Sequence, residues 1–249
     1  MSFKTIFNYS PNFDTTKRKP QQIKFIIFHY TGIKKENDSI KRLTSAKSKV
    51  SSHYLIKNDG QIITLVPDLY TAWHAGVSFW KNYKLLNKDS IGIEISNPGH
   101  EFNYKKFSKK QIQSISKLTK LLIKKYKIKP QNILGHSDIA PSRKKDPGEK
   151  FPWKYLSSNK IGYWHKLNQR KLDQNRYLKT KDLEKKIFVK NLKLIGYSTI
   201  PPKNSNIAIT KYMKIITKAF QRRFRQDKIN GIIDQECLMI SENLTKILN

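Results

Sequence analysis

Residues Ile133 to Gly148 read ILGHSDIAPSRKKDPG and place one histidine, two aspartates and three consecutive basic residues within sixteen positions. The apolar run Ile133–Gly135 predicts a short strand that leads into His136, and the prolines that follow predict a loop, where catalytic and ligand residues tend to lie. The residue before a proline favours an extended backbone, so Asp146 is expected to project to the same side as Lys144. The stretch therefore predicts one wall of a polar site.

Two earlier segments are predicted to be buried strands. Residues 23–30 (IKFIIFHY) are β-branched and aromatic, with His29 at the carboxyl end, where open α/β sheets place their ligands. Residues 90–96 (SIGIEIS) alternate, so that the three isoleucines share one face and Glu94 lies on the other.

The remaining patterns complete an α/β fold. Residues 108–126 predict the clearest helix, with a capping box between Ser108 and Gln111 and an apolar stripe behind it. Residues 53–66 predict a hairpin around an Asp-Gly turn. Further helices are expected over residues 38–49 and 151–156. Strands that alternate with helices indicate a mixed central β-sheet flanked by helices.

The chain is predicted to divide into four parts. Residues 157–180 are mostly polar, and three helical patterns without a strand follow them, at about 181–196, 207–225 and 234–248. The expected division is an N-terminal arm (1–21), an α/β domain that carries the site (22–160), a linker (161–180) and a small three-helix domain (181–249).

The composition of the chain restricts which partners, metal sites and membrane segments are expected. The formal charge of +32 comes from 50 Lys+Arg against 18 Asp+Glu and has two open explanations, an anionic partner or a lysine-rich habit of the source. The single cysteine, Cys237, excludes an intrachain disulfide and any cysteine-based zinc site. No run of 18 apolar residues and no export signal is found, so no transmembrane segment is expected.

Histidines and carboxylates offer a metal site. A catalytic zinc ion takes three protein ligands and keeps a fourth position open. His29 and His136 end predicted strands, and either Asp146 or Asp138 supplies an oxygen. Each residue also has a structural explanation, and Asp138 has three candidate roles: capping a turn, binding metal or orienting His136.

A hydrolase also needs a base and a cation for the oxyanion. Glu94 is the best carboxylate in the chain for the base, because a buried glutamate without a partner is costly. The alternative is a buried ion pair with a lysine. Lys144 suits the oxyanion role.

Five motifs resemble those of one family. FIIFHYTG, SSHYLIKNDG, AWHAG, IGIEI and GHSDIAPSRKKDPG, spread over about residues 20–156, are similar to the zinc-dependent N-acetylmuramoyl-L-alanine amidases of the AmpD/AmiD type, which share the fold of the peptidoglycan recognition proteins. The resemblance implies one zinc ion per chain, held by His29, His136 and Asp146. It also implies that Glu94 is the catalytic glutamate and that Lys144 is the lysine near the metal.

The resemblance further implies a substrate and partners. We expect hydrolysis of the amide between N-acetylmuramic acid and L-alanine in peptidoglycan or muropeptides, with Trp73, His74 and Arg143 lining the substrate. The alternative is a non-catalytic peptidoglycan-recognition module, and nucleic acid is not expected as a partner. Residues 219–240 resemble a three-helix peptidoglycan-binding domain. That tail indicates the cell envelope or periplasm, whereas the missing export signal indicates the cytoplasm.

Overall fold

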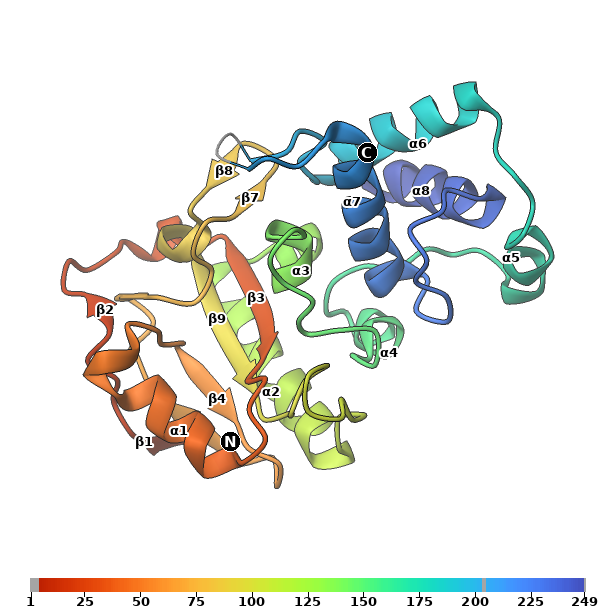
Figure 1. Ribbon diagram of the computed structural model, residues 1–249. Coiled ribbons are helices and arrows are strands. Elements are labelled where there is room, and N and C mark those ends of the chain that lie inside the picture. Colours follow the sequence, from red (N-terminus) through yellow and green to blue (C-terminus); the bar gives the residue numbers. More distant parts are fainter. Residues whose placement is uncertain (1–4, 203–204, 249) are drawn as a thin grey trace.

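The computed structural model describes residues 5–202 and 205–248. A six-stranded mixed sheet runs in the order β1-β5-β4-β9-β3-β10, and every neighbouring pair in it is parallel except β4 with β5. Its strands are β1 (Ile6–Phe7), β3 (Phe25–Tyr30), β4 (Tyr54–Ile56), β5 (Ile62–Thr64), β9 (Ser90–Ile95) and β10 (Ile133–Gly135). The mixed sheet flanked by helices confirms the predicted fold class (Figure 1).

The two faces of the sheet have different partners. Ile26 and Phe28 of β3 lie on the same face as the three isoleucines of β9, and helix α2 (Lys109–Tyr126) covers that face. Phe25 and Ile27 point to the other face, where they join a second core. Since side chains alternate along a strand, His29 also projects away from α2.

Helix α2 begins and ends as its sequence predicts. The Ser108 hydroxyl accepts a hydrogen bond from the Gln111 N–H at 3.1 Å, and the Gln111 side chain accepts one from the Ser108 N–H at 3.0 Å. This capping box satisfies two amide donors that the first turn cannot pair. The apolar stripe of Ile115, Leu118 and Leu122 is fully buried against the sheet.

The N-terminal segment does more than lead into the fold. Strand β1 pairs with β5 at the edge of the main sheet, and β2 (Phe13–Asp14) pairs with β6 (Thr71–Ala72). The predicted hairpin is confirmed as β4 and β5, and the first helix is α1 (Glu36–Thr44). A separate two-stranded sheet joins β7 (Phe79–Trp80) to β8 (Tyr83–Lys84).

The C-terminal part is helical, as the sequence predicts. Three helices match the three patterns, α6 (Asp182–Ile195), α7 (Ile209–Phe224) and α8 (Gln235–Leu248), and we call them the helical unit. Helices α3 (His136–Ile139), α4 (Trp153–Ser158) and α5 (Gln169–Asn175) come earlier, and α5 lies inside the segment expected to be a linker. No helix in residues 5–202 and 205–248 is long and apolar enough to cross a membrane.

The helical unit lies beside α3 and the β7–β8 sheet (Figure 1), and its buried side chains belong to the same hydrophobic core as Phe25 and Ile27 of β3. Trp80 of β7 is fully buried, and its ring packs edge-on against Tyr197 with 4.9 Å between centroids. A Cβ atom at Gly196 would lie 2.4 Å from the Trp80 ring, so only glycine allows this close approach. Contacts of this kind join the two parts of the chain into one packed body.

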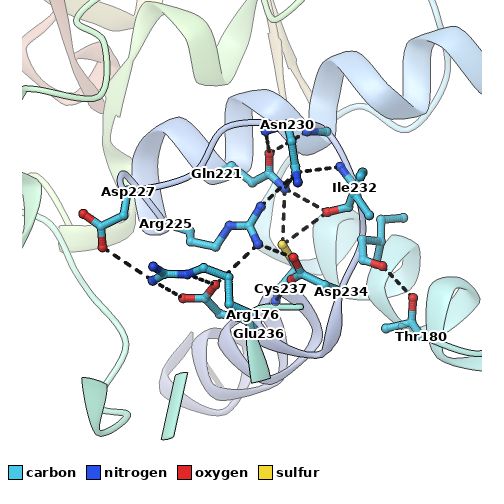
Figure 2. A network of polar contacts seen from close by, with 12 residues as sticks. Arg176, Thr180, Gln221, Arg225, Asp227, Asn230, Ile232, Asp234, Glu236 and Cys237 are labelled. Carbon is cyan, nitrogen blue, oxygen red and sulfur yellow. Dashed lines mark hydrogen bonds and ion pairs between the residues drawn. The ribbon is translucent and has the colours of Figure 1, made fainter. Parts of the chain in front are cut away.

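A buried polar network fixes the loop between α7 and α8 (Figure 2). Arg225 donates to Asp234 and Glu236, and Arg176 donates to both carboxylate oxygens of Glu236 at 2.8 and 2.9 Å. The Gln221 side chain accepts from the backbone N–H groups of residues 230 and 231. The network therefore ties Arg176, which directly follows α5, to the start of α8, and it holds the loop between α7 and α8 without reaching the sheet.

Candidate active site

Three predicted metal ligands converge at the carboxyl ends of the central strands. The Nδ1 atoms of His29 and His136 are 2.9 Å apart, and the Asp146 Oδ2 atom lies 3.1 Å from the first and 3.0 Å from the second. All three side chains are buried. Only these residues form a cluster of possible metal ligands in the part of the chain that the structure describes.

Strand register explains the convergence. His29 of β3 is the register partner of Glu94 of β9, so the two side chains lie next to each other on one face. On the other side of β3, Gly135 of β10 pairs with Phe28. His136 follows Gly135 directly and therefore arrives beside His29. Parallel strands in this arrangement place ligands at the crevice beyond their carboxyl ends.

Hydrogen bonds to the outer ring nitrogens select the tautomer that a metal needs. The His136 Nε2 atom lies 3.1 Å from the Ala75 carbonyl oxygen, which only accepts, so Nε2 carries the proton and Nδ1 keeps its lone pair. The His29 Nε2 atom lies 3.0 Å from Nδ1 of His74, whose Nε2 atom lies 3.2 Å from the Ser90 hydroxyl. The Ser90 hydroxyl donates onward to a backbone carbonyl. A relay in this direction leaves Nδ1 of His29 free to bind a metal.

Electrostatics favour the metal-binding protonation states. Burial and the neighbouring His136 ring lower the pKa of His29 to about 4, so its ring is neutral at neutral pH. Burial opposes ionisation of Asp146, but its hydrogen bonds to His136 and His29, together with the attraction of either ring when protonated, outweigh burial and hold its pKa well below the usual range. Two imidazoles and one carboxylate form a donor set that suits Zn²⁺.

Glu94 is the carboxylate without a partner. It is half-buried in the cavity wall, and its Oε2 atom has no hydrogen-bond partner. Burial and the negative charge of Asp146 raise its pKa to about 8, while Lys144 acts in the opposite direction. Among the described residues no cation forms an ion pair with Glu94, so the alternative of a structural salt bridge is not found.

A cavity of about 430 Å³ joins these groups. Of the predicted site residues, seven line it: His29, His74, Glu94, His136, Arg143, Lys144 and Asp146. Among the described residues that line the cavity, Trp73 is not found. Its indole N–H instead donates to the Asp14 carboxylate at 2.8 Å. Arg143 donates to the carbonyls of Ala75 and Val77, at 3.0 and 2.6 Å, and so supports the segment that holds His136.

Asp138 has a different role from the ligands. One of its carboxylate oxygens accepts the Gly135 N–H at 2.8 Å, and the other accepts the Tyr197 hydroxyl at 2.6 Å. The sequence left three roles open for Asp138: capping a turn, binding metal or orienting His136. The structure shows that it caps the turn. Both of its oxygens are engaged away from the three-ligand cluster.

Sequence reasoning missed Ser90 and Gly92. A Cβ atom at Gly92 would lie 2.5 Å from the His74 ring, so glycine makes room for the imidazole that contacts His29. The signal was present, because strand alternation places Ser90, Gly92 and Glu94 on the same face. It was not used because a serine and a glycine in a strand carry no chemistry by themselves.

Comparison with known proteins agrees with this arrangement. Residues 19–149 match the family model described as N-acetylmuramoyl-L-alanine amidase. The chain is 34% identical to the N-acetylmuramoyl-L-alanine amidase AmiD of Escherichia coli, in a match that covers 92% of this chain and 86% of that protein. The chain belongs to this amidase family.

The members of this family are enzymes. The expectation that this chain is an amidase is therefore supported over the alternative of a module that only recognises peptidoglycan. The 1,6-anhydro-N-acetylmuramyl-L-alanine amidase AmpD of Haemophilus influenzae is 35% identical over 61% of this chain and 90% of its own length.

Solved structures extend the likeness beyond the α/β domain. The structure of E. coli AmiD in complex with the substrate anhydro-N-acetylmuramic acid-L-Ala-D-γ-Glu-L-Lys covers 91% of this chain and 90% of its own, with a TM-score of 0.78 and 34% identity. Pseudomonas aeruginosa AmpDh3 covers 95% of this chain and 96% of its own, with a TM-score of 0.77 and 31% identity. Because both matches cover more than nine tenths of this chain, the helical unit belongs to the architecture that this amidase shares with AmiD and AmpDh3.

Proposed function

We propose that this amidase hydrolyses the amide between the lactyl group of N-acetylmuramic acid and the L-alanine of the stem peptide, with zinc as its cofactor. The observation that carries the proposal is the placement of three metal donors, at most 3.1 Å apart, next to a carboxylate whose oxygen has no partner. Family membership supplies the reaction class.

The donor set fits zinc. Donors of a tetrahedral zinc site lie about 3.3 Å from one another, so His29, His136 and Asp146 need to move apart by only a few tenths of an ångström. Zn²⁺ in such a site polarises the scissile carbonyl and makes water more acidic. His74 and Ala75 hold the two imidazoles by their outer nitrogens, which keeps the donor atoms directed at one point.

Glu94 acts as general base and then as general acid. Its carboxylate lies beside His29 in the cavity wall, where its ionised form would take a proton from the attacking water and pass it to the leaving amine. Its free oxygen is available for this transfer because no side chain of the protein occupies it.

Lys144 stabilises the negative charge that develops on the carbonyl oxygen. It lines the cavity and acts electrostatically on both Glu94 and His29, which places its charge near the reacting atoms. Arg143 is exposed at the same wall and presents a cation to the acidic stem peptide.

We infer that the enzyme works in the cell envelope, where peptidoglycan lies; the alternative is the cytoplasm. The AmiD and AmpDh3 structures were solved with anhydro-N-acetylmuramic acid peptides, which supports muropeptides as ligands of this cavity. The helical unit would hold the enzyme on the polymer. Fractionation of cells that express the full chain, followed by immunoblotting, tests the compartment.

Mass spectrometry of digested muropeptides tests the reaction. Purified protein with one equivalent of zinc should release free L-alanyl peptide, and chelation or the Glu94→Gln substitution should stop the release. Glu101→Gln is the matched control, because Glu101 is an exposed carboxylate at the rim of the same cavity. If the zinc-loaded wild type releases no peptide, the proposal fails.

A further inference from the structure

One arginine of the helical unit is buried against the metal-ligand segment. Arg223, on α7, is 2% exposed. Its guanidinium donates to Asp138 Oδ2 at 2.5 Å and to the Ile133 carbonyl at 2.8 Å, and it stacks 4.4 Å from the centre of the Trp153 ring. Its buried Nε atom has no partner, so the ion pair with Asp138 is the contact that compensates the buried charge.

The partner of Arg223 controls the turn that carries His136. Asp138 Oδ2 accepts the Gly135 N–H, and Gly135 and Asp138 lie on either side of the ligand in the sequence. The other oxygen of Asp138 accepts the hydroxyl of Tyr197, which follows α6. Two side chains of the helical region therefore hold the carboxylate that shapes this turn.

The neighbouring arginine reaches the other end of the same segment. Arg222 lies 3.8 Å from the Glu149 carboxylate, three residues beyond the ligand Asp146. Gln226, just after α7, donates to the Phe151 carbonyl at 2.8 Å. The carboxyl end of α7 thus contacts the chain on both sides of the stretch that supplies two of the three ligands.

We propose that α7 is part of the support of the metal site and that Arg223 is a positioning residue for His136. The inference rests on the proposed zinc function of that site. Without Arg223, the Asp138 carboxylate is left buried and uncompensated, and the turn around His136 loses its fixed shape. The helical unit then determines metal affinity in addition to any contact with the polymer.

Zinc affinity tests this role. Arg223→Met and Tyr197→Phe are made in the full chain, and the zinc dissociation constant is measured by competition with a chromogenic chelator. We expect both variants to bind zinc about 10-fold or more weakly, as for other groups that orient metal ligands. Their amidase activity should return when excess zinc is supplied, which loss of a purely structural contact would not produce.

Arg225→Met is the matched control. Arg225 follows the same helix and is 3% exposed, but its ion pairs with Asp234 and Glu236 stay inside the helical unit. This variant should lose stability and keep the wild-type zinc dissociation constant within about twofold, measured well below its unfolding temperature.

The outcomes distinguish failure of the positioning role of Arg223 from failure of the proposed zinc function. Wild-type zinc affinity in folded Arg223→Met overturns the positioning role, and so does an equal loss of affinity in Arg225→Met. If Arg223→Met does not fold, Tyr197→Phe decides, because it removes a single hydroxyl. A wild-type protein that binds no zinc overturns the proposed zinc function itself.

Discussion

Replacing Glu94 with glutamine keeps the shape of the side chain and removes its charge, and we expect opposite effects on activity and on the stability of the zinc-free protein. Burial and the charge of Asp146 raise the pKa of Glu94 from 4.5 to about 8. The folded state therefore binds this proton more tightly than the unfolded state does. The resulting stabilisation is complete below pH 4.5 and is lost as the pH rises through 8.

The size of this effect follows from the same pKa. A rise from 4.5 to about 8 corresponds to about 5 kcal/mol for a fully buried carboxyl group. Glu94 is only half-buried, and water in the cavity screens its charge, so we expect the wild type to lose about 2 kcal/mol relative to Glu94→Gln between pH 5 and pH 9. Loss of the base should lower amidase turnover by about 10²- to 10⁴-fold.

Urea unfolding in the presence of a chelator, at both pH values, measures the first quantity, and peptide release with zinc measures the second. Comparing the variant with the wild type at each pH cancels the titration of all other groups. A stability difference that does not change with pH would refute the reasoning from burial. Retention of more than a tenth of the wild-type turnover would refute the assignment of Glu94 as the base.

Three further predictions concern the metal and its surroundings. Gly92→Ala should push the His74 ring away from His29 and weaken zinc binding by about 10- to 100-fold in a chelator competition. Because burial lowers the pKa of His29 to about 4, protonation of this ligand should not compete with zinc until the pH falls towards that value; replacing His29 with alanine should therefore remove the acid-side loss of zinc near pH 4 that equilibrium dialysis of the wild type measures. Lys144→Met should lower turnover by about 10²- to 10³-fold with the zinc dissociation constant unchanged.

Local sequence patterns were sufficient to predict the strands and the helix that surround the site. Alternation along residues 90–96 placed Glu94 opposite the isoleucines, and the structure confirms it on the face turned away from α2. The capping box at Ser108 and the Asp-Gly hairpin were also predicted correctly, because each depends on residues close together in the chain.

Long-range partners could not be predicted. No feature of the first 21 residues indicated that Ile6 and Phe7 would add an edge strand, because that pairing depends on β5, more than fifty residues later. Arg223 is one of 50 basic residues and has no mark in the sequence that separates it from a solvated side chain. The pairing of strands and the burial of charges depend on tertiary contacts that periodicity does not encode.

The burial of Trp80 under Gly196 and Tyr197 has an evolutionary consequence. Trp80 lies on β7, and residues from Gly196 onwards cover it. Deleting this C-terminal tail would expose the Trp80 side chain and the apolar surface around it to solvent. A truncated descendant would then be prone to aggregate until other substitutions made the surface polar. Loss of the tail therefore requires several surface substitutions on the amidase part at the same time, which makes its loss improbable once the contact exists.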